Sequence, residues 1–111
     1  FVLTNSKNYQ ETAQKGLLAT DSEGKPFTIK DFWFGETGLL DIFKPQTQTW
    51  LWDKYKTLVK QGMGGVWGDL GEPEKHPAEI RHVAGKADDV RNIYGHYWAK
   101  TVYEGYAKDF P

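Results

Sequence analysis

Two long stretches of the chain carry apolar residues at helical spacing, which predicts two amphipathic helices. The first has Pro45 at its first position and is stopped by Gly62; its apolar stripe is Leu51, Tyr55, Leu58 and Val59. The second runs from about Asp89 to Lys108, and Asp88 or Asp89 could cap it. Its apolar stripe, expected to pack on a sheet, is Val90, Ile93, Tyr94, Tyr97, Trp98, Val102 and Tyr106.

Shorter patterns fill the rest of the chain. Ser6 is a predicted N-cap for a helix over about 8–15, which Gly16 ends. Apolar runs at 1–4, 39–42 and 63–67 predict short extended segments, the last of them a buried strand. A turn signal at 21–26 lies between two apolar triplets and predicts a β-hairpin-like excursion. The order of helices and strands is typical of an α/β fold with parallel strands.

One carboxylate stands out because of its place in this pattern. Asp69 follows the predicted strand at 63–67, inside the sequence Trp67-Gly68-Asp69-Leu70-Gly71-Glu72-Pro73. Barrel enzymes place catalytic groups at the carboxyl ends of their strands, and a Trp ring can stack on the apolar face of a sugar. The common role of a lone Asp is to cap a turn. Its neighbours Trp67, Glu72 and Pro73 favour the catalytic interpretation.

These residues carry a resemblance to glycoside hydrolase family 31, whose nucleophile motif is Trp-x-Asp-x-x-Glu-Pro. Downstream, the segment 91–95 (Arg-Asn-Ile-Tyr-Gly) resembles the family's His-Asn-x-Tyr-Gly. Upstream, 32–35 and 40–45 resemble its Trp-Pro-Gly and Pro-Asp-Phe stretch. The three matches come in the family's order and cover nearly the whole chain, least well in the first 25 or so residues.

The resemblance implies a retaining α-glycosidase with Asp69 as nucleophile. The family's acid/base is a second Asp on a later strand, beyond this chain. Trp67 is expected to form a wall of the sugar pocket, and Trp33 to bind substrate, although a place in the core is as plausible for Trp33. Glu72 is expected to hold the loop or a nearby Arg rather than to touch substrate. Asp41 matches the Asp of the Pro-Asp-Phe stretch but could equally cap the helix behind Pro45.

The chain departs from the family pattern at two points. Leu70-Gly71 follows Asp69 where many members carry Met-Asn, which could change the floor of the pocket and the sugar or acceptor that fits. Arg91 stands where His is usual, which leaves the nucleophile assignment in place.

The length of the chain limits how much of such a fold it can hold. A (β/α)8 TIM barrel needs about 250 residues, and this chain has 111. Residues 1–111 are therefore predicted to be a segment of a glycosidase catalytic barrel, with about three βα units, the hairpin-like insertion and no separate second domain. The predicted partners are an α-linked oligosaccharide and the remainder of the barrel.

Composition narrows the partners further. The net charge of −1 and the absence of a basic patch argue against nucleic acid. The chain has no apolar run of 18 residues, which argues against a membrane span, and no cysteine, so disulfides and thiolate metal sites are excluded. The compartment stays open. His76, His82 and His96 follow no metal-binding spacing, so neither a metal nor another cofactor is expected.

Aromatic residues make up 15% of the chain, which suits a saccharide cleft as well as a core. Two other classes of protein therefore remain open: a non-catalytic carbohydrate-binding α/β module that uses these rings, and a purely structural α/β fragment. A binding module has no need for a carboxylate at a strand end between Trp67 and Glu72. The preferred sugar, and the choice between hydrolysis and transfer, are not set by these residues.

Overall fold

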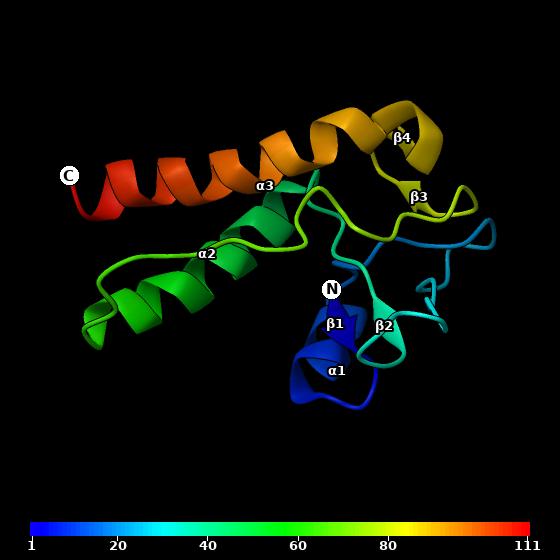
Figure 1. Cartoon of the computed structure of the whole chain (residues 1–111), viewed down its shortest axis with the longest axis horizontal. Coiled ribbons are helices and arrows are strands. Elements are labelled where there is room, and N and C mark those ends of the chain that lie inside the picture. The colour runs from blue at the N-terminus through cyan, green and yellow to red at the C-terminus, as the bar shows by residue number, and fades with distance from the viewer.

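The computed structural model describes residues 1–111, with three helices and two small sheets (Figure 1). In chain order the elements are β1 (Val2–Leu3), α1 (Lys7–Gln14), β2 (Thr37–Gly38), α2 (Pro45–Lys60), β3 (Arg81–His82), β4 (Gly85–Lys86) and α3 (Ala87–Asp109). Helices α2 and α3 pack against each other, and α1 lies with β1 and β2 at a separate corner. The mixed α/β class is the one that the sequence predicts.

The predicted helix ends are confirmed for α1 and α2. The Ser6 hydroxyl accepts a hydrogen bond from the backbone N–H of Tyr9 at 3.1 Å, and Gly16 follows α1 with a φ of 68°. Pro45 opens α2, and Gly62 follows it with a φ of 108°. A positive φ costs glycine little, which is why it ends both helices.

The predicted cap of α3 is wrong. Lys86 holds the N-cap position and makes no side-chain cap, while Asp88 and Asp89 lie in the first turn. A carboxylate there still meets the positive end of the helix dipole. Asp88 also pairs with Arg91, with 3.0 Å between Oδ1 and Nη2.

The strands correct the prediction of a parallel sheet. β1 pairs with β2 and β3 with β4, both antiparallel. Residues 63–69 form no strand, and the predicted buried strand at 63–67 is wrong. A strand exists through hydrogen bonds to a neighbour, and no other part of this chain pairs with the segment. Its glycines and Trp67 are consequently exposed.

The hairpin-like excursion is confirmed and contributes to the core. The N–H of Phe27 donates to the Ala19 carbonyl at 3.0 Å, and the carboxylate of Asp21 accepts the N–H groups of Glu23 and Lys25. The core joins this excursion to the segment after β2 and to the residue before β3. Its largest fully buried aliphatic side chains are Leu18, Ile29, Leu39, Ile42 and Ile80.

Candidate active site

Asp69 lies in an exposed loop, and one of its two carboxylate oxygens is fixed. Oδ1 accepts the N–H of Leu70 at 3.0 Å, and Oδ2 has no hydrogen-bond partner in the chain. Leu70 has a φ of 64°, in the left-handed region that a bulky residue rarely adopts. Such backbone persists only where the surroundings hold it, and it concentrates at functional sites. The surroundings here are the helix beneath the loop.

Glycines let this loop lie directly on α3. A Cβ added to Gly68 would overlap the six-membered ring of Trp98, and one added to Gly71 would stand 3.1 Å from the same side chain. Gly95 meets the backbone of the loop in the same way, with the carbonyl oxygen of Gly71 3.0 Å from its Cβ position. The loop that carries Asp69 thus packs so closely on Trp98 and Gly95 that these glycine positions have no room for a side chain larger than hydrogen.

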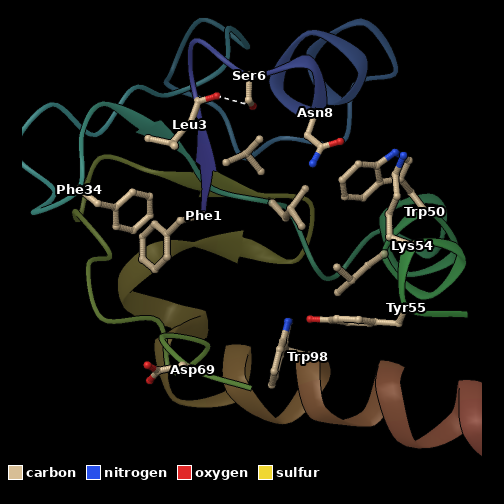
Figure 2. A pocket seen from close by; sticks show the side chains of 13 residues that line it. Phe1, Leu3, Ser6, Asn8, Phe34, Trp50, Lys54, Tyr55, Asp69 and Trp98 are labelled. Atoms are coloured by element: carbon tan, nitrogen blue, oxygen red, sulfur yellow. Dashed lines mark hydrogen bonds between the residues drawn. The ribbon is translucent and has the colours of Figure 1, made fainter. Parts of the chain in front are cut away.

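Asp69 also stands on the rim of a pocket of about 450 Å³. Figure 2 shows the carboxylate at one edge, with the hydroxyl of Tyr55 and the indole of Trp98 turned toward each other across the floor. The remaining lining residues come from the N-terminal segment with β1 and α1, from the segments on either side of β2, and from α2; they include Phe1, Trp50 and Lys54. Burial raises the pKa of Tyr55, so its hydroxyl stays protonated at neutral pH.

A second pocket, of about 260 Å³, surrounds Trp33. The side chain of Trp33 is 73% exposed, and its Nε1–H donates to Glu74 Oε2 at 3.2 Å. Lys75 pairs with Asp31 at 2.9 Å on the same rim, and this hydrogen bond lowers the pKa of the Asp31 carboxyl. Trp33 is therefore not part of the core. Its ring is oriented by a residue of the loop that follows Asp69.

Trp67 and Glu72 do not make, within this chain, the contacts that the sequence predicts for them. Trp67 is 90% exposed and lines neither pocket. Glu72 forms no ion pair with an arginine, and Glu74, two residues further on, makes the link to Trp33 instead. The expected roles of Trp67 and Glu72 stay predictions.

A buried polar cluster that the sequence did not reveal lies behind this loop. Asp41 is 1% exposed and accepts three hydrogen bonds: from the N–H of Phe43, from the N–H of Val83 at 2.7 Å, and from Nδ1 of His82 at 3.3 Å. His82 Nε2 lies 2.7 Å from His76 Nε2. Asp41 and His82 stand 41 residues apart, so no local pattern could announce the pair. Asp41 does not cap α2, whose N-cap is Lys44.

Tyr94 of α3 closes this cluster. Its ring centroid lies 5.7 Å from that of His76 and 5.6 Å from that of His82. The hydroxyl donates to the Leu40 carbonyl at 2.8 Å, and burial, with the nearby Asp41, raises the pKa of Tyr94 far above its usual range. Tyr94, which matches the Tyr of the family's motif, is therefore a buried residue that connects α3 to the segment after β2 through a hydrogen bond.

Comparison with known proteins decides the family. The model of the glycosyl hydrolases family 31 TIM-barrel domain matches residues 2–111. The chain belongs to this family. Its fold is therefore that of a partial family-31 barrel, and the α/β prediction is confirmed.

Three relatives of this family-31 chain illustrate the match. A sulfoquinovosidase of Escherichia coli (strain K12) is 29% identical over 107 residues, which cover 94% of this chain and 15% of the relative. A Flavobacterium johnsoniae GH31 dextranase complexed with glucose superposes with a TM-score of 0.86 at 28% identity, over 97% of this chain and 14% of its own. A GH31 α-xylosidase from a soil metagenome complexed with xylose gives 0.84 at 28% identity, over 99% and 17%. The chain thus spans about one-seventh of its relatives.

Two further observations concern the rest of this family-31 segment. It contains no group of three or more His, Asp or Glu side chains placed to hold a metal ion. None of its helices combines the length and the apolar character that a bilayer crossing requires.

Proposed function

We propose that the protein carrying this segment is a retaining α-glycosidase or α-glucosyltransferase that acts on α-linked oligosaccharides, with Asp69 as its nucleophile. The observation that carries this proposal is the state of the Asp69 carboxylate. It is exposed, its Oδ1 is held by the N–H of Leu70, and its Oδ2 is left without a partner. A family-31 motif surrounds it, in a chain that belongs to that family.

The chemistry follows from the free oxygen. Oδ2 of Asp69 bonds to the anomeric carbon while the glycosidic C–O bond breaks, and the leaving oxygen takes a proton from a second carboxyl group about 5–5.5 Å away. Water then attacks the glycosyl ester and hydrolysis is complete, whereas a sugar hydroxyl in its place gives transfer. The acid/base is the Asp that the family resemblance puts on a later strand, outside these 111 residues. No metal or cofactor is needed in this scheme.

Glu72 is not that acid. It lies three residues beyond Asp69 on the same loop, whereas the two carboxyl groups must approach the scissile bond from opposed sides.

Trp33 is well placed to contact the substrate, because its exposed ring is oriented by Glu74 beside a pocket. We assign it to a sugar face, with Trp67 as a second ring that the completed pocket would use. Aromatic stacking of this kind keeps a polar N–H available for a sugar hydroxyl.

The remainder of the barrel is the proposed partner of the apolar surface. Several large apolar side chains are exposed, among them Trp67, Ile93 and Tyr103. The segment 63–69 also has backbone N–H and C=O groups without a neighbouring strand, and backbone groups left unpaired in a protein interior are rare. Further strands of the barrel would satisfy these backbone groups by pairing with 63–69, and further barrel elements packed on α3 would cover Ile93 and Tyr103.

A covalent trap tests the proposal. The full-length protein is incubated with a 5-fluoro-α-glucosyl fluoride, digested, and searched by mass spectrometry for the added fluoroglycosyl group. The expected adduct is on Asp69, in the peptide that contains Gly68 and Leu70. Asp69→Asn is the matched control, since its nearly isosteric amide cannot form the ester. An adduct on any other carboxylate would remove Asp69 from the role.

The same experiment separates the other class of protein. A carbohydrate-binding module would bind an α-linked oligosaccharide equally well with Asp69→Asn and would take up no label. In a glycosidase the Asp69→Asn variant also binds the oligosaccharide, but the wild-type protein is labelled on Asp69 and hydrolyses its substrate.

A further inference from the structure

The three residues Asp41, His82 and His76 form a hydrogen-bonded chain whose protons can be assigned. Both oxygens of Asp41 accept, so Nδ1 of His82 must carry the proton of their shared bond. Nε2 of a neutral His82 is then an acceptor, and the proton at 2.7 Å comes from Nε2 of His76. Nδ1 of His76 is left as a buried acceptor with no partner. In this arrangement, with His82 neutral, each ring holds one proton.

This chain of hydrogen bonds connects the loop of Asp69 to two other segments. Asp41 belongs to the segment after β2, His82 to β3, and His76 to the end of the loop itself. All three side chains are buried, with exposures of 1%, 7% and 9%. Asp69 lies where this loop crosses the surface of α3, and the first buried, hydrogen-bonded side chain after it is that of His76. His76 is thus the inner anchor of the loop, and Trp98 with Gly95 forms the outer one.

We propose that the Asp41–His82–His76 chain is a positioning unit that holds the loop of Asp69 in its reactive geometry, with the His76 to His82 hydrogen bond as its essential link. This rests on the proposed function of Asp69. A carboxylate displaced by about 1 Å from its attack geometry can lose up to about 100-fold in rate. Holding the loop from inside therefore acts on the chemical step, and the binding of sugar is left unchanged.

The groups around His76 agree with an uncharged link. On α3 it faces Tyr94, Asp88 and Arg91, whose Nη2 lies 3.4 Å from the His76 carbonyl oxygen, and on β3 it faces His82. Burial first, then His82 and Arg91, lowers the pKa of His76 to about 4, and Asp88 opposes this only weakly. A proton added to Nδ1 would have no acceptor. The link is therefore intact at neutral pH.

Isosteric variants test the link in the full-length protein. In His76→Gln the amide NH₂ takes the place of Nε2 and can still donate to His82, whereas in His76→Asn the shorter side chain cannot reach. His76→Leu fills the space without a hydrogen bond. We expect kcat and the labelling rate to fall by up to about 100-fold in the Asn and Leu variants at unchanged KM, with His76→Gln close to wild type. His96→Gln, an exposed histidine on α3, is the control.

Hydrogen exchange supplies a readout that needs no activity. The backbone amides of 69–72, 74 and 75 should exchange faster in His76→Asn and His76→Leu than in wild type, and at the wild-type rate in His76→Gln. If Leu and Gln behave alike in rate and in exchange, the hydrogen bond has no positioning role and the proposal is overturned. Should Asn and Leu fail to fold, His82→Asn decides: it keeps the bond to Asp41 and loses the one to His76.

The two proposals fail separately. If Asp69 takes no label in the wild-type protein, the proposed nucleophile is wrong, whatever the exchange data show. If Asp69 is labelled at the wild-type rate in His76→Leu, the nucleophile stands and the positioning unit is wrong.

Discussion

Gly95 in the middle of α3 lies against Gly71 of the Asp69 loop so closely that a Cβ on Gly95 would stand 3.0 Å from the Gly71 carbonyl oxygen. Backbone meets backbone at this point, and no flexible side chain is present to move aside. The packing of the loop on α3, and with it the position of Asp69, therefore depends on the absence of a side chain at Gly95.

Gly95→Ala should separate stability from activity. Alanine favours a helix interior over glycine by about 1 kcal/mol, so α3 itself gains. The loop must retreat by a few tenths of an ångström, which should lower kcat by less than about 100-fold. The measurement is kcat against the melting temperature of the full-length protein. A variant with unchanged kcat would show that the loop position does not control the reaction.

Gly68→Ala should be more damaging than Gly64→Ala. A Cβ at Gly68 overlaps Trp98, whereas one at Gly64 meets nothing within 4 Å, and the two glycines lie in the same segment. Overpacking of this kind costs about 1–3 kcal/mol. Thermal unfolding should register the difference, with Gly64→Ala close to wild type. Equal melting temperatures would mean that Trp98 moves aside freely.

Asp69→Asn should abolish turnover in the full-length protein while an oligosaccharide substrate still binds. The amide keeps the size of the carboxylate and its acceptor for the Leu70 N–H, but it cannot form the glycosyl ester. Steady-state hydrolysis of an aryl α-glucoside and calorimetric binding measure the two quantities. Ordinary turnover in this variant would refute the assignment.

The 111 residues on their own should be inactive. They contain the proposed nucleophile without the second carboxyl group, and general acid–base catalysis contributes about 10²–10⁴-fold. The assay is release of the aryl group from an α-glucoside by the purified segment, with the same segment carrying Asp69→Asn as the background. Activity above that background would mean that an acid/base lies within the chain.

Acid should weaken the fold through His76. Its pKa is lowered to about 4 in the folded protein, and it is about 6.5 in an unfolded chain. Between these values the unfolded chain binds a proton that the folded one does not. The contribution of uncharged His76 to the free energy of unfolding is therefore fully present above about pH 6.5, and it is lost as the pH falls toward 4.

Melting curves recorded from pH 7 to pH 4 check this effect. The melting temperature of His76→Gln, which cannot titrate, should fall less over that range than that of wild type. Parallel curves for the two proteins would show that His76 titrates alike in both states.

Features that depend on neighbouring residues, such as helix ends and turns, can be predicted from the sequence. Ser6, Pro45 and Gly62 set helix ends through bonds and dihedral angles within a few residues, and the turn at Asp21 is made by its own side chain. The sequence misplaces the start of α3 because two aspartates with good capping propensity follow the lysine that holds the cap position. Such an error of one or two residues is usual at helix ends.

Contacts between residues far apart in the chain cannot be predicted from its local patterns. The segment 63–67 has the apolar pattern of a strand, yet a strand needs a neighbour, and the pattern does not say where that neighbour lies. Asp41 was singled out for a different reason, and its bonds to His82 and Val83 cross 41 and 42 residues. The motif contains Glu72 and gives no reason to choose Glu74, because only the fold brings Glu74 to Trp33.

The turn of the hairpin-like excursion is closed by its own residues. The carboxylate of Asp21 accepts two backbone N–H groups of the turn, and residues 22–25 are exposed. Residues 22–25 make hydrogen bonds and ion pairs only within the excursion, and exposed tips with small polar residues are where insertions are best tolerated. A short peptide tag or a fluorophore placed between Ser22 and Gly24 would therefore report on the folded protein and leave the loop of Asp69 undisturbed.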